Sequence, residues 1–171
     1  MSNTQSATIE HTDVATGLPY AALVEAFEKQ VGRWDAATAE SLVQRNAPWS
    51  VVEAEASRAG GARGLMIIET INQGVVTSLS GQPKHCRLYL VGNPAIASRI
   101  LDVDPRGVFY VPFRVSLYDD GGPAGAHIAY DRPSSFLAAL GQAELAAIGA
   151  QLDEKIDGVT RALCGSHAAA L

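Results

Sequence analysis

Two β-rich runs in the middle of the chain limit what it can fold into more than any other feature. The first covers residues 85–91 and the second covers residues 110–118, and a glycine-rich turn joins the second to a third run that ends at Tyr130. Asn93 suits the residue before a helix and Pro94 suits its first residue, which predicts a short helix after the first run. The stretch therefore predicts the order strand, helix, strand, turn, strand.

Helices are predicted on both sides of that stretch. Apolar residues recur every three or four positions within residues 137–163, which is typical of a long amphipathic helix. These positions are Leu145, Ile148, Leu152, Ile156, Val159 and Leu163. Pro19 and a one-sided apolar spacing predict another helix over residues 19–32. Helical composition over residues 34–43 and 49–59 predicts a helical insertion, residues 33–63, that packs on the edge of the core.

Further strands are predicted over residues 7–14 and 65–71, because both segments are rich in β-branched residues. Together these elements predict a two-layer α/β (α+β) domain. Its sheet is expected to be mixed, mainly antiparallel and of about five strands, with helices packed on one face. The length of 171 residues and the absence of repeats or linkers predict a single domain over residues 1–171.

Side chains alternate along a strand, so each predicted strand divides into two sets. One set is apolar and is expected to pack against the C-terminal helix: Cys86, Leu88, Leu90, Phe113, Val115, Leu117, Ile128 and Tyr130. The other set is amphipathic: His85, Arg87, Tyr89, Val91, Arg114, Ser116, Tyr118, His127 and Ala129. An amphipathic face suits contact with solvent, a subunit interface, or a pocket in which arginine holds an anionic ligand.

The composition argues against several classes of function. A net charge of −5 and scattered Lys and Arg residues argue against a nucleic-acid binder, because such proteins present a basic stripe to phosphate. No apolar run is long enough to span a membrane and the first residues lack a signal-peptide pattern, so a cytoplasmic protein is expected. Cys86 and Cys164 are too few for a disulfide framework and are interpreted as reduced thiols.

Few reactive side chains form a recognisable motif, and neither a nucleotide-binding glycine motif nor a GxSxG elbow occurs. Cys86 follows His85, but strand neighbours point to opposite faces, so Cys86 is interpreted as an inert core thiol. His85 and His127 could meet across strands as metal or haem ligands. The other two histidines, His11 and His167, fall in predicted tails and are not expected to join them. The aspartates at element ends suit caps and turns: Asp102, Asp104, Asp119, Asp120 and Asp131.

The residues from His85 to about 136 resemble the family catalogued as domain of unknown function 302. The resemblance rests on Gly92-Asn93-Pro94 after a strand, Asp104-Pro105 after a short helix, and the Pro-x-Arg segment that begins at Pro112. It implies a small α/β domain with a family-like core over residues 65–136, a homodimer and no settled activity. Some members carry two cysteines in this region; Cys86 matches the first, but Phe113 occupies the second position, which puts two-thiol chemistry in doubt.

Three hypotheses of function follow, and none of them identifies a cofactor. The first is a non-enzymatic homodimeric module whose Arg/Tyr/His face forms the dimer contact or binds a small anionic molecule, and neither nucleic acid nor a membrane is expected as a partner. Its expected ligand-binding residues are His85, Arg87, Tyr89, Asn93, Arg114, Tyr118 and His127. The second is an enzyme in which His85 or His127 is a general base beside a substrate-holding arginine. The third is a haem or metal carrier that uses His85, His127 or Cys86.

Overall fold

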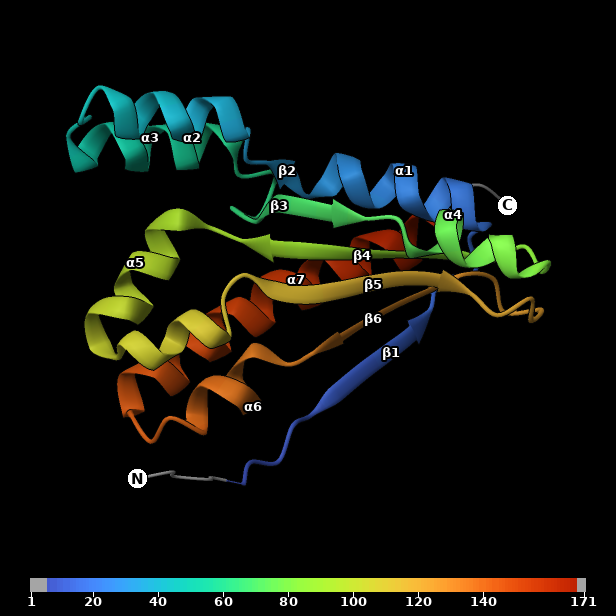
Figure 1. Ribbon diagram of the computed structural model, residues 1–171. Helices are drawn as coiled ribbons and strands as arrows, with labels where there is room; N and C mark the ends of the chain where they lie inside the picture. The colour runs from blue at the N-terminus through green and yellow to red at the C-terminus, as the bar shows by residue number, and fades with distance from the viewer. Residues whose placement is uncertain (1–5, 169–171) are drawn as a thin grey trace.

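Within residues 6–168, which a computed structural model describes, six strands form one sheet (Figure 1). The strands are β1 His11–Ala15, β2 Gly32–Arg33, β3 Met66–Ile71, β4 His85–Gly92, β5 Phe113–Asp119 and β6 His127–Asp131. They lie in the order β1-β6-β5-β4-β3-β2, and neighbours are antiparallel except β2 and β3. The predicted α/β class and mainly antiparallel sheet are confirmed, and the two-residue strand β2 is an addition to the prediction.

The helices follow the predicted order, with one correction. They are α1 Tyr20–Gln30, α2 Ala36–Gln44, α3 Trp49–Ala59, α4 Gln73–Thr77, α5 Pro94–Val103, α6 Pro133–Ala138 and α7 Ala143–Ala168, with 3-10 turns η1 Ser78–Ser80 and η2 Pro105–Phe109. The single helix predicted over residues 137–163 is two helices, because Gly141 adopts φ +80° between α6 and α7. None of the described helices is both long enough and apolar enough to cross a membrane.

The core lies between the sheet and helices α1 and α7, which cover the same face. Its buried side chains come from these helices and from the central strands: Leu23, Phe27, Leu145, Ile148, Leu152, Ile156, Val159, Leu163, Val91, Phe113, Val115, Leu117, Ile128 and Tyr130. The predicted packing of the C-terminal helix against the apolar sets of β5 and β6 is therefore confirmed.

The pairing of β4 with β5 corrects the predicted faces. Leu90 stands opposite Arg114 and Tyr89 stands opposite Val115, and opposed residues of an antiparallel pair share a face. The prediction placed the β4 sets on the wrong sides, because alternation divides one strand into two sets but does not fix its register against the next. Tyr89 accordingly lies in the helix-covered core, and Leu90 lies on the opposite face.

We term that opposite side the open face, since neither α1 nor α7 covers it. It carries alternate residues of five strands: Glu69 and Ile71 of β3, Cys86, Leu88 and Leu90 of β4, Arg114, Ser116 and Tyr118 of β5, His127, Ala129 and Asp131 of β6, and His11, Asp13 and Ala15 of β1. The prediction of Cys86 as a core thiol is therefore wrong: Cys86 is half-buried and lines a hollow beside α4.

An ionic network joins β6 and α6 to α7. Arg132 donates two hydrogen bonds to the Asp157 carboxylate, both at 3.1 Å, and lies 3.2 Å from Asp153. Tyr130 donates to Asp157 at 2.7 Å, and both the backbone N–H and the hydroxyl of Ser134 donate to Asp153. Because Asp153 is buried, its charge depends on these partners for compensation.

The α2–α3 hairpin projects from the sheet edge and is joined to it through a narrow neck (Figure 1). The chain enters the hairpin at Gly32 and leaves it at Gly61. A Cβ atom on Gly32 would lie 1.7 Å from the Ala59 carbonyl oxygen, and one on Gly61 would lie 2.4 Å from the Gln30 carbonyl oxygen. Glycine is required at both positions because the entering and leaving backbones are in direct contact.

Candidate functional site

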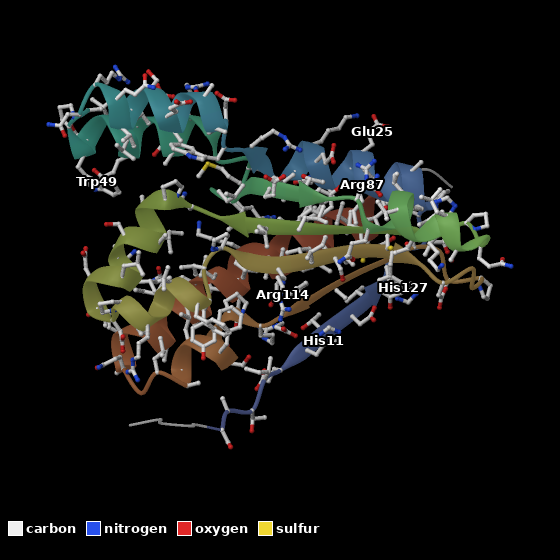
Figure 2. The ribbon with its side chains drawn as sticks, viewed as in Figure 1. His11, Glu25, Trp49, Arg87, Arg114 and His127 are labelled. Atoms are coloured by element: carbon white, nitrogen blue, oxygen red, sulfur yellow. The ribbon has the colours of Figure 1, made fainter. Side chains whose placement is uncertain are left out.

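The sheet register divides the predicted ligand-binding residues into two groups. His85, Arg87 and Tyr89 of β4 lie on the helix-covered side, beside α1, whereas Arg114, Tyr118 and His127 lie on the open face. Figure 2 shows Arg87 close to α1, and Arg114 and His127 apart along the sheet. Asn93, the remaining predicted residue, precedes α5. The structure thus does not bring the seven residues together on one surface.

The group beside α1 connects β4 to that helix. Tyr89 donates to Glu28 Oε1 at 2.9 Å, Arg87 lies 3.3 Å from the same oxygen, and the His85 and Tyr20 rings lie 5.2 Å apart. Burial, together with the hydrogen bond to the Glu28 carboxylate, raises the pKa of Tyr89 to about 12. These contacts anchor α1 to β4.

One end of the open face carries a carboxylate between an imidazole and a phenol. His127 Nδ1 lies 2.8 Å from Asp13 Oδ1, and Tyr118 donates to Asp13 Oδ2 at 2.5 Å. The Tyr118 and His127 rings stack at 4.9 Å. Burial by itself would raise the pKa of Asp13, but the hydrogen bonds from Tyr118 and His127 outweigh it and hold that pKa below its usual value. The hydrogen bond to Asp13 raises the pKa of Tyr118 to about 12.

The other end of the open face carries a second cluster, centred on Asp131. Arg114 Nη2 lies 3.3 Å from Asp131 Oδ2, and His11 Nδ1 lies 3.0 Å from Asp131 Oδ1. The Arg114 side chain is 69% exposed, so most of its hydrogen-bonding capacity faces solvent. Because Arg114 is exposed and its ion pair with Asp131 is long, N–H groups of its guanidinium remain available to another anion at this end.

A pocket of about 500 Å³ opens beside Arg114. Its wall is aromatic: the Tyr110 ring stacks on Phe136 at 5.3 Å with an interplanar angle of 9°, and Phe109 meets Tyr110 edge-on at 5.1 Å. The apolar lining is completed by Ile9, Leu90, Pro112 and Phe113, while Arg114 and Asp131 form the polar rim. We term this hollow the aromatic pocket. It combines flat apolar walls with one cation, which suits a planar ligand that bears an anionic group.

Comparison with known proteins places the chain in a family. A family model described as "Domain of unknown function DUF302" matches residues 43–163, which is more than half of the chain. The chain belongs to the DUF302 family. A crystal structure of an uncharacterized conserved DUF302 protein from Bacillus stearothermophilus is similar to it, with a TM-score of 0.62 and 15% sequence identity over 90% of this chain and 97% of that one. A search of curated proteins found no match.

Within this DUF302 chain, Asn93 is occupied by local structure. Its side-chain oxygen accepts from the Ala95 backbone N–H at 2.9 Å, as the predicted helix cap requires, and its amide nitrogen donates to the Gly64 carbonyl at 2.9 Å. Asn93 therefore ties α5 to the loop that precedes β3. Both ends of its amide therefore make local hydrogen bonds.

The predicted histidine pair does not converge in the DUF302 chain. His85 lies on the helix-covered side of β4 and His127 lies on the open face of β6, so the two rings cannot share one metal ion. Cys86 and His127 share the open face, but Tyr118 stands between them. In the part of the chain that the structure describes, no group of three His, Cys, Asp or Glu side chains is placed to hold a metal.

Sequence reasoning missed several residues that complete the open face of the DUF302 fold. His11 lies in β1, in line with the strand predicted over residues 7–14 and against its interpretation as a tail residue, and Asp131 pairs with Arg114 and His11 instead of serving a turn. Asp119, in contrast, accepts from the Gly121 N–H, as expected of a turn aspartate. Within the strand predicted there, the alternation of His11 and Asp13 with Thr12 and Val14 is the signal of a half-covered strand, and it could have assigned both residues to the exposed side.

Proposed function

We propose that this chain is a non-enzymatic, homodimeric module that binds a small planar anionic molecule in the aromatic pocket. The observation that carries the proposal is the position of Arg114, on the rim of a pocket whose wall is the stacked pair Tyr110 and Phe136. An arginine fork holds a carboxylate by two parallel hydrogen bonds, and aromatic walls take the apolar part of a flat ligand.

The charges around Arg114 permit an exchange of partners. Asp131 contacts both His11 and Arg114, and its contact with Arg114 is the longer of the two at 3.3 Å. A ligand carboxylate that takes the guanidinium leaves Asp131 with His11 as its partner. Since pairing of a carboxylate with arginine at an exposed site is worth at most about 1 kcal/mol, the existing ion pair is a weak competitor.

Titration calorimetry with 2-naphthoate tests the pocket, with the uncharged naphthalene-2-carboxamide as the matched ligand. We expect 2-naphthoate to bind about fivefold more tightly than the amide, and Arg114→Ala to remove that preference. Arg99→Ala is the control variant, because Arg99 is exposed on α5 and does not line the pocket. Equal affinities for the two ligands, or an Arg114→Ala variant that behaves like Arg99→Ala, would contradict the proposal.

The dimer is proposed to form through the open face. Support comes from apolar side chains on that face, since Ile71 is 44% exposed and Leu88 and Leu90 are only half-buried. Native mass spectrometry should therefore show a dimer that Leu88→Glu dissociates. Leu101→Glu is the control, because Leu101 is exposed on α5 rather than on the sheet. A wild-type monomer at micromolar concentration would overturn this part of the proposal.

A second candidate function is proton abstraction by His127, favoured by its contact with Asp13. A carboxylate on Nδ1 leaves Nε2 as the basic nitrogen, the arrangement of an oriented general base. Arg114, however, lies four residues along β5 from Tyr118, which neighbours His127; at roughly 3.3 Å per residue this is about 13 Å. A substrate would have to bridge that distance, so we favour the binding module. Nitrogen NMR of neutral His127 should show the Nδ1–H tautomer, and an Nε2–H tautomer would exclude this candidate.

A further inference from the structure

A second, smaller pocket lies on the other side of the Pro112-Phe113 segment, where α5 meets the start of the α2–α3 hairpin. It has a volume of about 200 Å³, and its main lining residues are Trp34, Ile68, Ile96, Ala97, Val111 and Leu152. We term it the apolar pocket. It shares Pro112 and Phe113 with the aromatic pocket, but neither Arg114 nor another charged side chain lines it.

The space in the apolar pocket depends on a glycine at the end of β4. A Cβ atom on Gly92 would lie 3.3 Å from Pro112 Cβ and 3.9 Å from Ile68 Cγ1. With hydrogen in place of that methyl group, the gap between Pro112 and Ile68 stays open toward α5. The hollow is therefore formed by packed backbone and branched side chains rather than by a loose surface loop.

The polar groups in the lining determine what the pocket can accept. The Asn93 amide is already bonded at both ends, to the Ala95 N–H and to the Gly64 carbonyl. Apart from Trp34, which carries an indole N–H, the other lining residues have apolar side chains or none. A charged ligand would lose its hydration here and gain no counter-ion, which is unfavourable, whereas an uncharged apolar group gains from leaving water.

The volume sets the size of the ligand. An apolar cavity of about 150 Å³ in another protein is large enough for benzene, so 200 Å³ accommodates a six-membered ring with one small substituent. We propose that the apolar pocket is a second ligand site, which binds an uncharged monocyclic hydrophobic molecule. This goes beyond the proposed function, because the aromatic pocket takes an anion through Arg114 and the apolar pocket has no cation.

Methyl NMR with toluene as the probe tests this site on the full chain. We expect saturable shifts of the Ile68 and Ile96 methyl signals, and at least tenfold weaker binding in Ala97→Leu, whose larger side chain fills the pocket. Ala150→Leu on the exposed side of α7 makes the same change outside the pocket and should stay within twofold of the wild type. Absence of saturable shifts, or equal weakening in both variants, would overturn the proposal.

Ile96→Ala gives an independent variant if Ala97→Leu does not fold. Removing this side chain enlarges the pocket, so the variant should bind naphthalene, whereas the wild type should bind it at least tenfold more weakly. Equal naphthalene binding by both proteins would contradict the assignment of the site to this pocket. The test is also separate from that of the proposed function: 2-naphthoate at the aromatic pocket should leave the Ile68 and Ile96 signals in place, whichever result toluene gives.

Discussion

Tyr89, whose side chain is fully buried, donates a hydrogen bond through its hydroxyl to Glu28 Oε1 at 2.9 Å and thereby joins β4 to α1. Phe27, one residue before Glu28, packs its ring 4.9 Å from the Tyr89 ring. One tyrosine thus makes an apolar contact and a charge-assisted hydrogen bond with the same turn of α1. The two contributions can be separated by mutation.

Tyr89→Phe should lower the free energy of unfolding by about 1–2 kcal/mol, because it removes a hydrogen bond to a carboxylate and keeps the ring. Tyr89→Ala should cost about 3–5 kcal/mol, because it also leaves a cavity against Phe27. Urea unfolding of both variants measures these values. A Tyr89→Phe variant as unstable as Tyr89→Ala would mean that the hydrogen bond, and not the packing, dominates.

Alkaline pH should destabilise the fold through the same residue. Burial raises the pKa of Tyr89 and of Tyr130 to about 12, against an ordinary value of 10.0. Above pH 10 the unfolded chain loses these protons before the folded chain does, so the stability that is complete below pH 10 falls as the pH rises toward 12. The loss should be on the order of 2 kcal/mol for each buried tyrosine. Unfolding in urea at a series of pH values tests this, and Tyr130→Phe should flatten the decline.

The network around Arg132 should be the most sensitive ionic contact described in the fold. Arg132→Ala leaves the buried carboxylate of Asp153 without its guanidinium partner. We expect the free energy of unfolding to fall by about 2–4 kcal/mol, which is less than for a fully buried pair because Arg132 is partly exposed. Arg58→Ala breaks an exposed pair with Glu55 on α3 and should cost less than about 1 kcal/mol. Thermal unfolding compares the two variants. Equal melting temperatures would mean that Ser134 alone compensates Asp153.

The pKa of Asp13 should depend on its two aromatic partners. Tyr118→Phe removes one of the hydrogen bonds that lower it, so the pKa should move up toward its usual value. Carboxylate carbon NMR over an acid titration measures this shift. The stability that the hydrogen-bonded Asp13 contributes is complete above its ordinary pKa and is lost as the pH falls through its lowered pKa. Ser116→Ala, a neighbouring change on the open face, should leave the Asp13 titration in place.

Local signals were sufficient to predict most of the elements. Asn93 and Pro94 mark the start of α5, and the three-to-four spacing from Leu145 to Leu163 marks α7, because caps and helical periodicity depend on residues close in sequence. The break at Gly141 is equally local and could have been read as a helix end.

Tertiary relationships account for what the sequence did not reveal. Whether Arg87 or Leu88 faces the helices depends on the register of β4 against β5, and that register depends on the whole sheet. An arginine is tolerated on the covered side because Glu28 of α1 meets it at the edge. The aromatic pocket likewise requires Phe136 to meet Tyr110 across 26 residues of chain, which no short pattern in the sequence indicates.

The neck formed by Gly32 and Gly61 makes the α2–α3 hairpin a separable part of the chain. Since the entering and leaving backbones touch, a linker of a few residues can replace residues 35–58 without stretching either end. Evolution can therefore lengthen, shorten or exchange this hairpin at little risk to the sheet, and an engineer can use the same junction to insert a foreign domain.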